Sequence, residues 1–167
     1  FAPSAVGKSE VISLRNTFMQ VDVSTKGARI GKLTLLDYNT YDSLPVKLIT
    51  GDSSRFNIVL QDGATSIRTE NLYFEPTTTT DSSITLRAST TAPSEYIEVT
   101  YKLAANGHFI DYSVHSTLSG TGNQATLEWY ETGLKKEKSL EQEKMRTTGY
   151  FKYTDDNPDY LSERSSD

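Results

Sequence analysis

The sequence contains no cysteine, only one tryptophan and only two histidines among its 167 residues. The lack of cysteine excludes disulfide bonds, a thiolate nucleophile and every cysteine-ligated zinc or iron–sulfur site. It does not identify a compartment, because an oxidising space permits disulfides without requiring them.

Clusters of positive charge and long apolar runs are also missing. No basic run is longer than Lys135 and Lys136, and the formal net charge is −5, so we exclude nucleic acid as a partner. No apolar run approaches the roughly 20 residues that span a bilayer. Residues 1–5 lack the basic end and apolar stretch of a signal peptide. We expect a soluble piece, which is compatible with a larger membrane-anchored parent.

What the sequence does contain is typical of β-structure. Ten Tyr and six Phe accompany many Thr and Ser residues, and such side chains suit a half-buried pleated sheet. Apolar and polar residues alternate in several stretches, each of which predicts a strand with one buried face. The apolar members are Met19, Val21 and Val23; Phe56, Ile58 and Leu60; Ile84, Leu86 and Ala88; Ile97, Val99, Tyr101 and Leu103; Ile110, Tyr112 and Val114; and Leu127 and Trp129.

Turn residues separate these stretches. Asn106-Gly107 is the clearest case and predicts a type I′ turn that pairs a strand near 96–104 with one near 108–118. Residues 134–146 break the alternation and predict a short helix or an exposed polar arm, and residues 150–153 predict one more strand. The prediction is an all-β antiparallel sandwich with at most one short helix, formed by one domain over residues 1–167. We expect loosely tied ends at 1–14 and 155–167.

Residues that could carry catalysis or bind metal are few. His108 and His115 lie an odd number of positions apart, so on one strand they would point to opposite faces and could not share a metal. Asp111, Glu128 and Glu131 are the acidic residues set in strong strands near aromatics, and solvated carboxylates are their preferred interpretation. Because no Gly-x-Ser-x-Gly elbow is present, hydrolase chemistry has no support. We therefore predict no catalytic, metal-binding or cofactor-binding residues and no enzymatic activity.

Two stretches carry a resemblance to a known family. The first, residues 16–33, has a strand, a turn at Gly27-Ala28 and a second strand, and resembles the opening of galactose-mutarotase-like β-supersandwich domains. The continuation through residues 35–38 and 44–49 is similar to the periplasmic domain of YidC-type membrane protein insertases. Residues 148–153 and 159–163 resemble that family's late strands, so the resemblance covers roughly 15–163.

The resemblance implies a function as well as a fold. It implies a supersandwich that forms a non-catalytic part of an insertase on the periplasmic face of the bacterial inner membrane, with this chain a fragment of the membrane-anchored parent. It also implies that Sec translocon components and nascent membrane proteins are the partners. Mutarotases use paired histidines and a glutamate, and this sequence offers no such histidine pair, so sugar chemistry does not follow.

A carbohydrate-binding or mutarotase-like sugar module is the alternative function. Trp129, Tyr130 and Tyr112 could stack on a sugar, although core packing is the preferred interpretation of Trp129. The two functions predict different surfaces. A sugar site needs an open sheet face with an exposed aromatic beside acid or amide groups, whereas an insertase domain could have a groove lined by apolar or mixed side chains.

Overall fold

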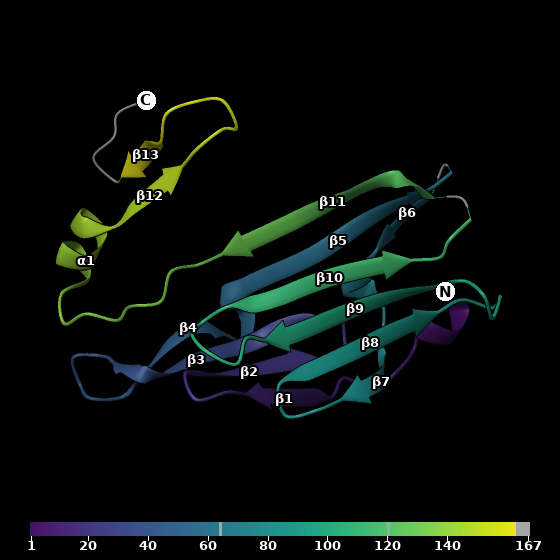
Figure 1. Ribbon diagram of the computed structural model, residues 1–167, viewed down its shortest axis with the longest axis horizontal. Helices are drawn as coiled ribbons and strands as arrows, with labels where there is room; N and C mark the ends of the chain where they lie inside the picture. The colour runs from purple at the N-terminus through teal and green to yellow at the C-terminus, as the bar shows by residue number, and fades with distance from the viewer. Residues whose placement is uncertain (64, 120, 163–167) are drawn as a thin grey trace.

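The computed structural model describes residues 1–63, 65–119 and 121–162, and the fold is an antiparallel β-sandwich elongated along one axis (Figure 1). Four strands form the first sheet in the order β1-β2-β3-β4, and four form the second in the order β10-β9-β8-β7. A third sheet has the order β11-β5-β6, and β12 pairs with β13. These strands are β1 (Val11–Arg15), β2 (Met19–Ser24), β3 (Arg29–Asn39), β4 (Pro45–Thr50), β5 (Ser54–Asp62), β6 (Thr65–Arg68), β7 (Glu75–Thr79), β8 (Ser83–Ser89), β9 (Tyr96–Leu103), β10 (Ile110–Ser116), β11 (Thr121–Glu131), β12 (Thr148–Phe151) and β13 (Asp159–Ser162).

Helical structure is minor. One α-helix, α1 (Leu140–Arg146), and three short 3₁₀ turns, η1 (Ala2–Ser4), η2 (Gly51–Ser53) and η3 (Thr69–Asn71), accompany the strands of the described chain. Ser139 caps α1, because its hydroxyl oxygen accepts a hydrogen bond from the Gln142 N–H at 3.3 Å. The prediction of an all-β fold with one short helix is confirmed. The helix covers only the second half of the predicted 134–146 segment.

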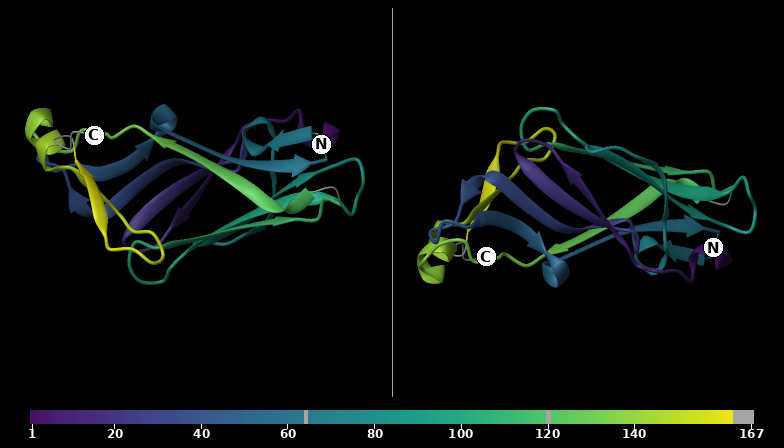
Figure 2. Two further views of the ribbon diagram at one scale, coloured as in Figure 1. Left: turned by 90° about the horizontal axis from the view of Figure 1, so that it is seen from above. Right: turned by 90° about the horizontal axis from the view of Figure 1, so that it is seen from below.

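The core lies between the first two sheets, which form the two layers seen edge-on in Figure 2. Alternate residues of β2, β8 and β9 point inward and are almost fully buried. The register places Leu86 opposite Val99 and Ile84 opposite Tyr101, so the inward residues of β8 and β9 form one apolar face. The alternation in the sequence therefore predicted these strands and their buried faces correctly.

The connection between β2 and β3 spans residues 25–28, since Ser24 pairs with Arg29. Gly27 and Ala28 both have positive φ, 77° and 47°, a left-handed conformation that glycine adopts at little cost. A Cβ at Gly27 would lie 3.2 Å from the Glu70 Cα, so the close approach to the η3 turn also favours glycine.

The hairpin predicted at Asn106-Gly107 exists, but the predicted turn type is wrong. β9 and β10 pair as expected, and among these two turn residues only Gly107 has a positive φ, 88°. The connection is longer than two residues, because the Ala104 N–H donates to the Phe109 carbonyl at 3.0 Å. The side-chain amide of Asn16 donates to the carbonyls of Ala104 and Gly107, which holds this longer loop in place.

The two ends of the chain differ in how they contact the sandwich. The Ser4 hydroxyl donates to the Ser89 carbonyl at 3.0 Å and accepts from the Ser89 N–H at 2.8 Å, so the N-terminal turn is tied to β8. β13 pairs with β12 at the other end of the molecule (Figures 1 and 2). The expected loose end at 155–167 falls partly on residues 163–167, which lie outside the described residues.

β11 is a strand, as the alternation predicted, but its expected buried face is not buried. Leu127 is 52% exposed and Trp129 is 59% exposed, so the interpretation of Trp129 as a core residue is wrong. Figure 2 shows the reason: β11 leaves the layer that contains β8–β10 and crosses toward the layer that contains β3 and β4. The face of β11 that carries Leu127 and Trp129 is consequently not covered by another strand of the described chain, and we call this uncovered region the open side of the sandwich.

Candidate functional site

A row of four aromatic rings leads from the core to the open side of the sandwich. Tyr101 of β9 lies 5.0 Å from Tyr112 of β10 between ring centroids, and Tyr112 lies 5.2 Å from Phe56 of β5. Phe56 contacts Trp129 of β11 at 5.9 Å. Exposure rises along the row from 2% at Tyr101 to 59% at Trp129, so the row forms a continuous apolar path to the surface.

The burial of the first two rings affects their ionisation. Burial raises the pKa of the Tyr101 phenol well above its usual value, and burial does the same for Tyr112. The Tyr101 hydroxyl donates to the Ala28 carbonyl at 2.7 Å. Both phenols therefore stay protonated and add no negative charge to the row.

All four rings of this row line an apolar groove with a volume of 270 Å³. Its lining residues come from six strands, β3, β4 and β5 in the first half of the chain and β9, β10 and β11 in the second half. They are Ile30, Leu33, Ile49, Ser54, Phe56, Tyr101, Ile110, Tyr112, Leu127 and Trp129. Nine of these ten side chains are aliphatic or aromatic, which makes the groove suited to an apolar ligand rather than to a charged one.

β10 borders this groove with an open edge. Within the described residues β10 pairs only with β9. The Thr117 N–H donates to the Tyr96 carbonyl at 3.0 Å, which marks this pair as hydrogen-bonded. Because hydrogen-bonded pairs alternate along an antiparallel ladder, the backbone N–H and C=O groups of Ile110, Tyr112 and Val114 point away from β9.

β11 has an open edge of the same kind. Within the described chain it pairs only with β5, and the Thr132 N–H donates to the Ser53 carbonyl at 2.7 Å just beyond the strand. The same alternation directs the backbone groups of Leu127 and Trp129 away from β5. Two strand edges that can accept a further strand therefore accompany the groove.

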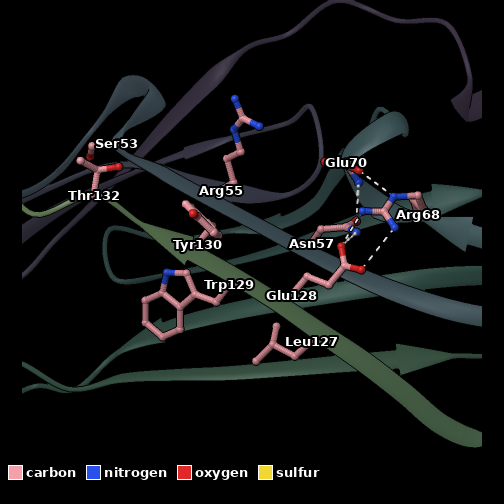
Figure 3. A pocket seen from close by; sticks show the side chains of 10 residues that line it. All are labelled: Ser53, Arg55, Asn57, Arg68, Glu70, Leu127, Glu128, Trp129, Tyr130 and Thr132. Carbon is pink, nitrogen blue, oxygen red and sulfur yellow. Dashed lines mark hydrogen bonds and ion pairs between the residues drawn. The ribbon is translucent and has the colours of Figure 1, made fainter. Parts of the chain in front are cut away.

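The opposite face of β11 and β5 is polar, as Figure 3 shows. Arg68 of β6 donates to both carboxylate oxygens of Glu128, and its Nε donates to Glu70 at 2.7 Å. The Asn57 amide donates to Glu128 at 3.0 Å. The hydrogen bonds from Arg68 and then from Asn57 lower the pKa of Glu128, and those to Glu128 and Glu70 raise the pKa of Arg68.

This polar network occupies one end of a surface hollow of 890 Å³. Tyr130 and Arg55 lie at the other end. Tyr130 is 75% exposed and points to the same side as Arg55, whereas Leu127 and Trp129 point to the other side of β11 (Figure 3). The polar groups of Asn57, Arg68, Glu70 and Glu128 are thus engaged with one another.

The structure separates the candidate residues that the sequence suggested. His108 lies in the β9–β10 loop rather than on a strand, where its Nε2 is 2.8 Å from the Asp37 carboxylate. His115 is exposed on β10, and its ring lies 6.1 Å from Tyr96. Among the described residues no three His, Asp or Glu side chains gather in a way that could hold a metal ion.

The acidic candidates lie on solvent-facing sides of two different sheets. Asp111 is exposed on β10 opposite Lys102, and Glu131 is exposed at the end of β11. Glu128 is paired with Arg68, a partner 60 residues away that sequence reasoning missed. Only tertiary structure brings these two together, and no local pattern around Arg68 pointed to the pair.

Comparison with known families decides the relationship that the sequence suggested. The family described as the YidC periplasmic domain matches residues 11–165. The chain belongs to the YidC periplasmic domain family. It is 33% identical to the membrane protein insertase YidC of Porphyromonas gingivalis over 172 residues, which cover 97% of this chain and 27% of the relative. The YidC insertases of Bacteroides fragilis and Cytophaga hutchinsonii are 26% and 28% identical to it, with all of this chain covered in each case.

The chain spans about a quarter of the length of the YidC relatives that it matches, 27% in the Porphyromonas gingivalis protein. No solved structure matches it significantly. Because the relatives are membrane insertases, the family implies a membrane-anchored parent. None of the helices in the described part of the chain is long and apolar enough to cross a bilayer.

Proposed function

We propose that this YidC periplasmic domain acts without catalysis of its own, on the periplasmic face of the inner membrane, by holding other proteins during membrane insertion and folding. The observation that supports this function is the apolar groove between two open strand edges. An extended segment of a nascent membrane protein can place apolar side chains in the groove. Its backbone can pair with the free groups of β10 or β11.

The groove has the composition of a protein-binding site. Aromatic side chains give large contact areas at small entropic cost, and Trp129, Phe56 and Tyr112 lie together within it. A nascent membrane protein is rich in apolar residues, so it matches this lining better than a polar partner does. A Sec translocon component that offers an extended apolar segment would use the same contacts.

The carbohydrate alternative has weaker support. Tyr130 is exposed in the same hollow as the Glu128 carboxylate and the Asn57 amide, a combination that a sugar site would require. However, Glu128 already accepts hydrogen bonds from Arg68 and Asn57, and Glu70 accepts from Arg68. A sugar would have to displace these partners before its hydroxyl groups could bind.

Photo-crosslinking of the membrane-anchored parent tests the proposal. A photoreactive side chain replaces Trp129 or Tyr112 in the groove, and matched probes replace Asp111 and Lys102 on the outer face of the neighbouring strands. We expect adducts with nascent membrane proteins or Sec components from the groove positions and few from the outer positions. Equal adducts from both sets would contradict the groove as the binding site. Absence of protein adducts together with calorimetric binding of a sugar would favour the carbohydrate alternative.

A further inference from the structure

One end of the molecule brings together three segments that the aromatic groove does not use. The tip of the β3–β4 hairpin, the linker that follows β11 and helix α1 lie side by side at the end far from the N-terminus (Figures 1 and 2). Tyr41 and Leu44 of the hairpin and Lys135 of the linker line one surface hollow of 330 Å³, and the Glu143 carboxylate of α1 accepts a hydrogen bond from the Lys136 N–H of the linker.

Positive charge is concentrated in the linker and α1. Residues 134–146 contain five Lys or Arg and three Glu, in a chain whose net charge is −5. Lys135, Lys138 and Arg146 are exposed. The carboxylate of Glu143 accepts backbone hydrogen bonds from the Lys136 N–H at 3.0 Å and from the Glu137 N–H at 3.2 Å, which lowers its pKa. The negative charge of Glu143 is therefore engaged by backbone N–H groups that hold the linker against α1.

Exposed apolar side chains lie next to these cations. Tyr41 is 57% exposed and Leu44 is 59% exposed at the hairpin tip. The tip is well defined, because the Thr40 N–H donates to the Leu44 carbonyl at 2.8 Å and the Ser43 N–H donates to the Thr40 carbonyl at 3.0 Å. Lys47 belongs to the same hollow and adds another cation beside the two apolar side chains.

This combination is typical of a surface that contacts lipid headgroups. Tyrosine is enriched at the level of the headgroups, and Lys and Arg are attracted to anionic phosphate groups. The remainder of this acidic chain would be repelled by an anionic surface, so charge also selects the end that faces it. The acidic residues of the three segments are Asp42, whose carboxylate accepts from the Thr40 hydroxyl, together with Glu137, Glu141 and Glu143, and the adjacent β12–β13 hairpin adds Asp155, Asp156 and Asp159.

We propose that this basic end, defined by Tyr41, Leu44, Lys47, Lys135, Lys138 and Arg146, docks on an anionic phospholipid surface. The membrane-anchored parent places such a surface within reach of the domain. Docking at this end leaves the groove lined by Trp129 and Phe56 to other proteins, so the two proposals stand or fall separately.

Co-sedimentation of the 167-residue chain with lipid vesicles tests the proposal. We expect binding to vesicles of phosphatidylethanolamine with phosphatidylglycerol, little binding to phosphatidylcholine vesicles, and weaker binding at high salt. The variant Lys135→Glu/Lys138→Glu should lower the partition coefficient roughly tenfold. The control Lys8→Glu/Lys102→Glu makes the same change in net charge at other exposed positions and should change it less than about twofold.

A second pair of variants tests the apolar contribution. Tyr41→Ser/Leu44→Ser should weaken vesicle binding, whereas Val6→Ser, which alters a side chain that is 84% exposed near the N-terminus, should leave it unchanged. Equal loss in the basic-end and control variants would overturn the proposal, as would equal binding to neutral vesicles or no vesicle binding at all. Concentration-dependent dimers without vesicle binding would instead assign this end to a second copy of the chain.

Discussion

The indole ring of Trp129 meets the phenyl ring of Phe56 edge to face, with centroids 5.9 Å apart and ring planes inclined by 77°. The two residues are also cross-strand partners in the β5–β11 pair. An exposed tryptophan is thus held by a half-buried phenylalanine whose other side contacts Tyr112. This contact connects the groove to the core and explains how an exposed aromatic keeps a defined orientation.

Truncation of leucines should distinguish the open face of β11 from the core. Leu86→Ala should lower the free energy of unfolding by about 2–5 kcal/mol, because it leaves a cavity between the two layers. Leu127→Ala should cost less than about 1 kcal/mol, since its side chain is 52% exposed. Urea unfolding followed by circular dichroism measures both values. Comparable losses in the two variants would show that the inner face of β11 is covered in solution.

The pKa of the Glu128 carboxyl should depend on Arg68. In the native chain this pKa lies below its usual value. Between the native pKa and the usual pKa, the unfolded chain therefore binds more protons than the native chain. The contribution of Glu128 to stability is consequently lost as the pH falls through the native pKa. Arg68→Met should move this pKa upward. A carbon-detected NMR titration of the glutamate side chains measures the shift. Glu143, which is held by backbone N–H groups, serves as the control and should keep its lowered pKa.

Removal of the Asn16 side chain should destabilise the sandwich by about 2–4 kcal/mol, because several hydrogen bonds are lost at once. Its amide nitrogen donates to two carbonyls of the β9–β10 loop, and its oxygen accepts from the N–H groups of Phe18 and Met19 at 2.8 Å. Asn16→Ala is compared with Asn106→Ala by chemical denaturation. Because Asn106 is exposed, Asn106→Ala should lower the free energy of unfolding by less than about 0.5 kcal/mol. A small effect at Asn16 would contradict its role in holding the loop.

Alkaline titration should separate two of the ten tyrosines from the rest. Burial raises the pKa of Tyr101 and Tyr112 in the native state, so the native chain binds more protons than the unfolded chain above the usual tyrosine pKa. Stability should therefore fall as the pH rises beyond about 10. Phenolate absorbance should show these two groups ionising only as the chain unfolds. Tyr112→Phe should remove one late-titrating group.

The pairing of β9 with β10 shows which features of a hairpin can be predicted from local sequence. Alternation of apolar residues and an Asn-Gly pair predicted both strands and their connection, because these features act over a few residues. The turn geometry could not be predicted in the same way. It depends on Asn16, which donates to carbonyls 88 and 91 positions further along the chain.

The exposure of Trp129 is a feature that local sequence could not predict. Alternation identifies which residues share a face of β11, but whether that face is covered depends on the path of the strand between the layers. The contact of Arg68 with Glu128 likewise has no local signal, since the two residues come from different strands of one sheet.

By itself, the sequence determined the all-β class, the buried faces of β2, β8 and β9 and the relationship to YidC periplasmic domains. These depend on residue periodicity and on motifs that are contiguous in the chain. The groove, its two open edges and the basic end were decided only by tertiary structure. Each is formed by residues that are far apart in the sequence, and a strand edge or an exposed face exists only once the neighbouring strands have been placed.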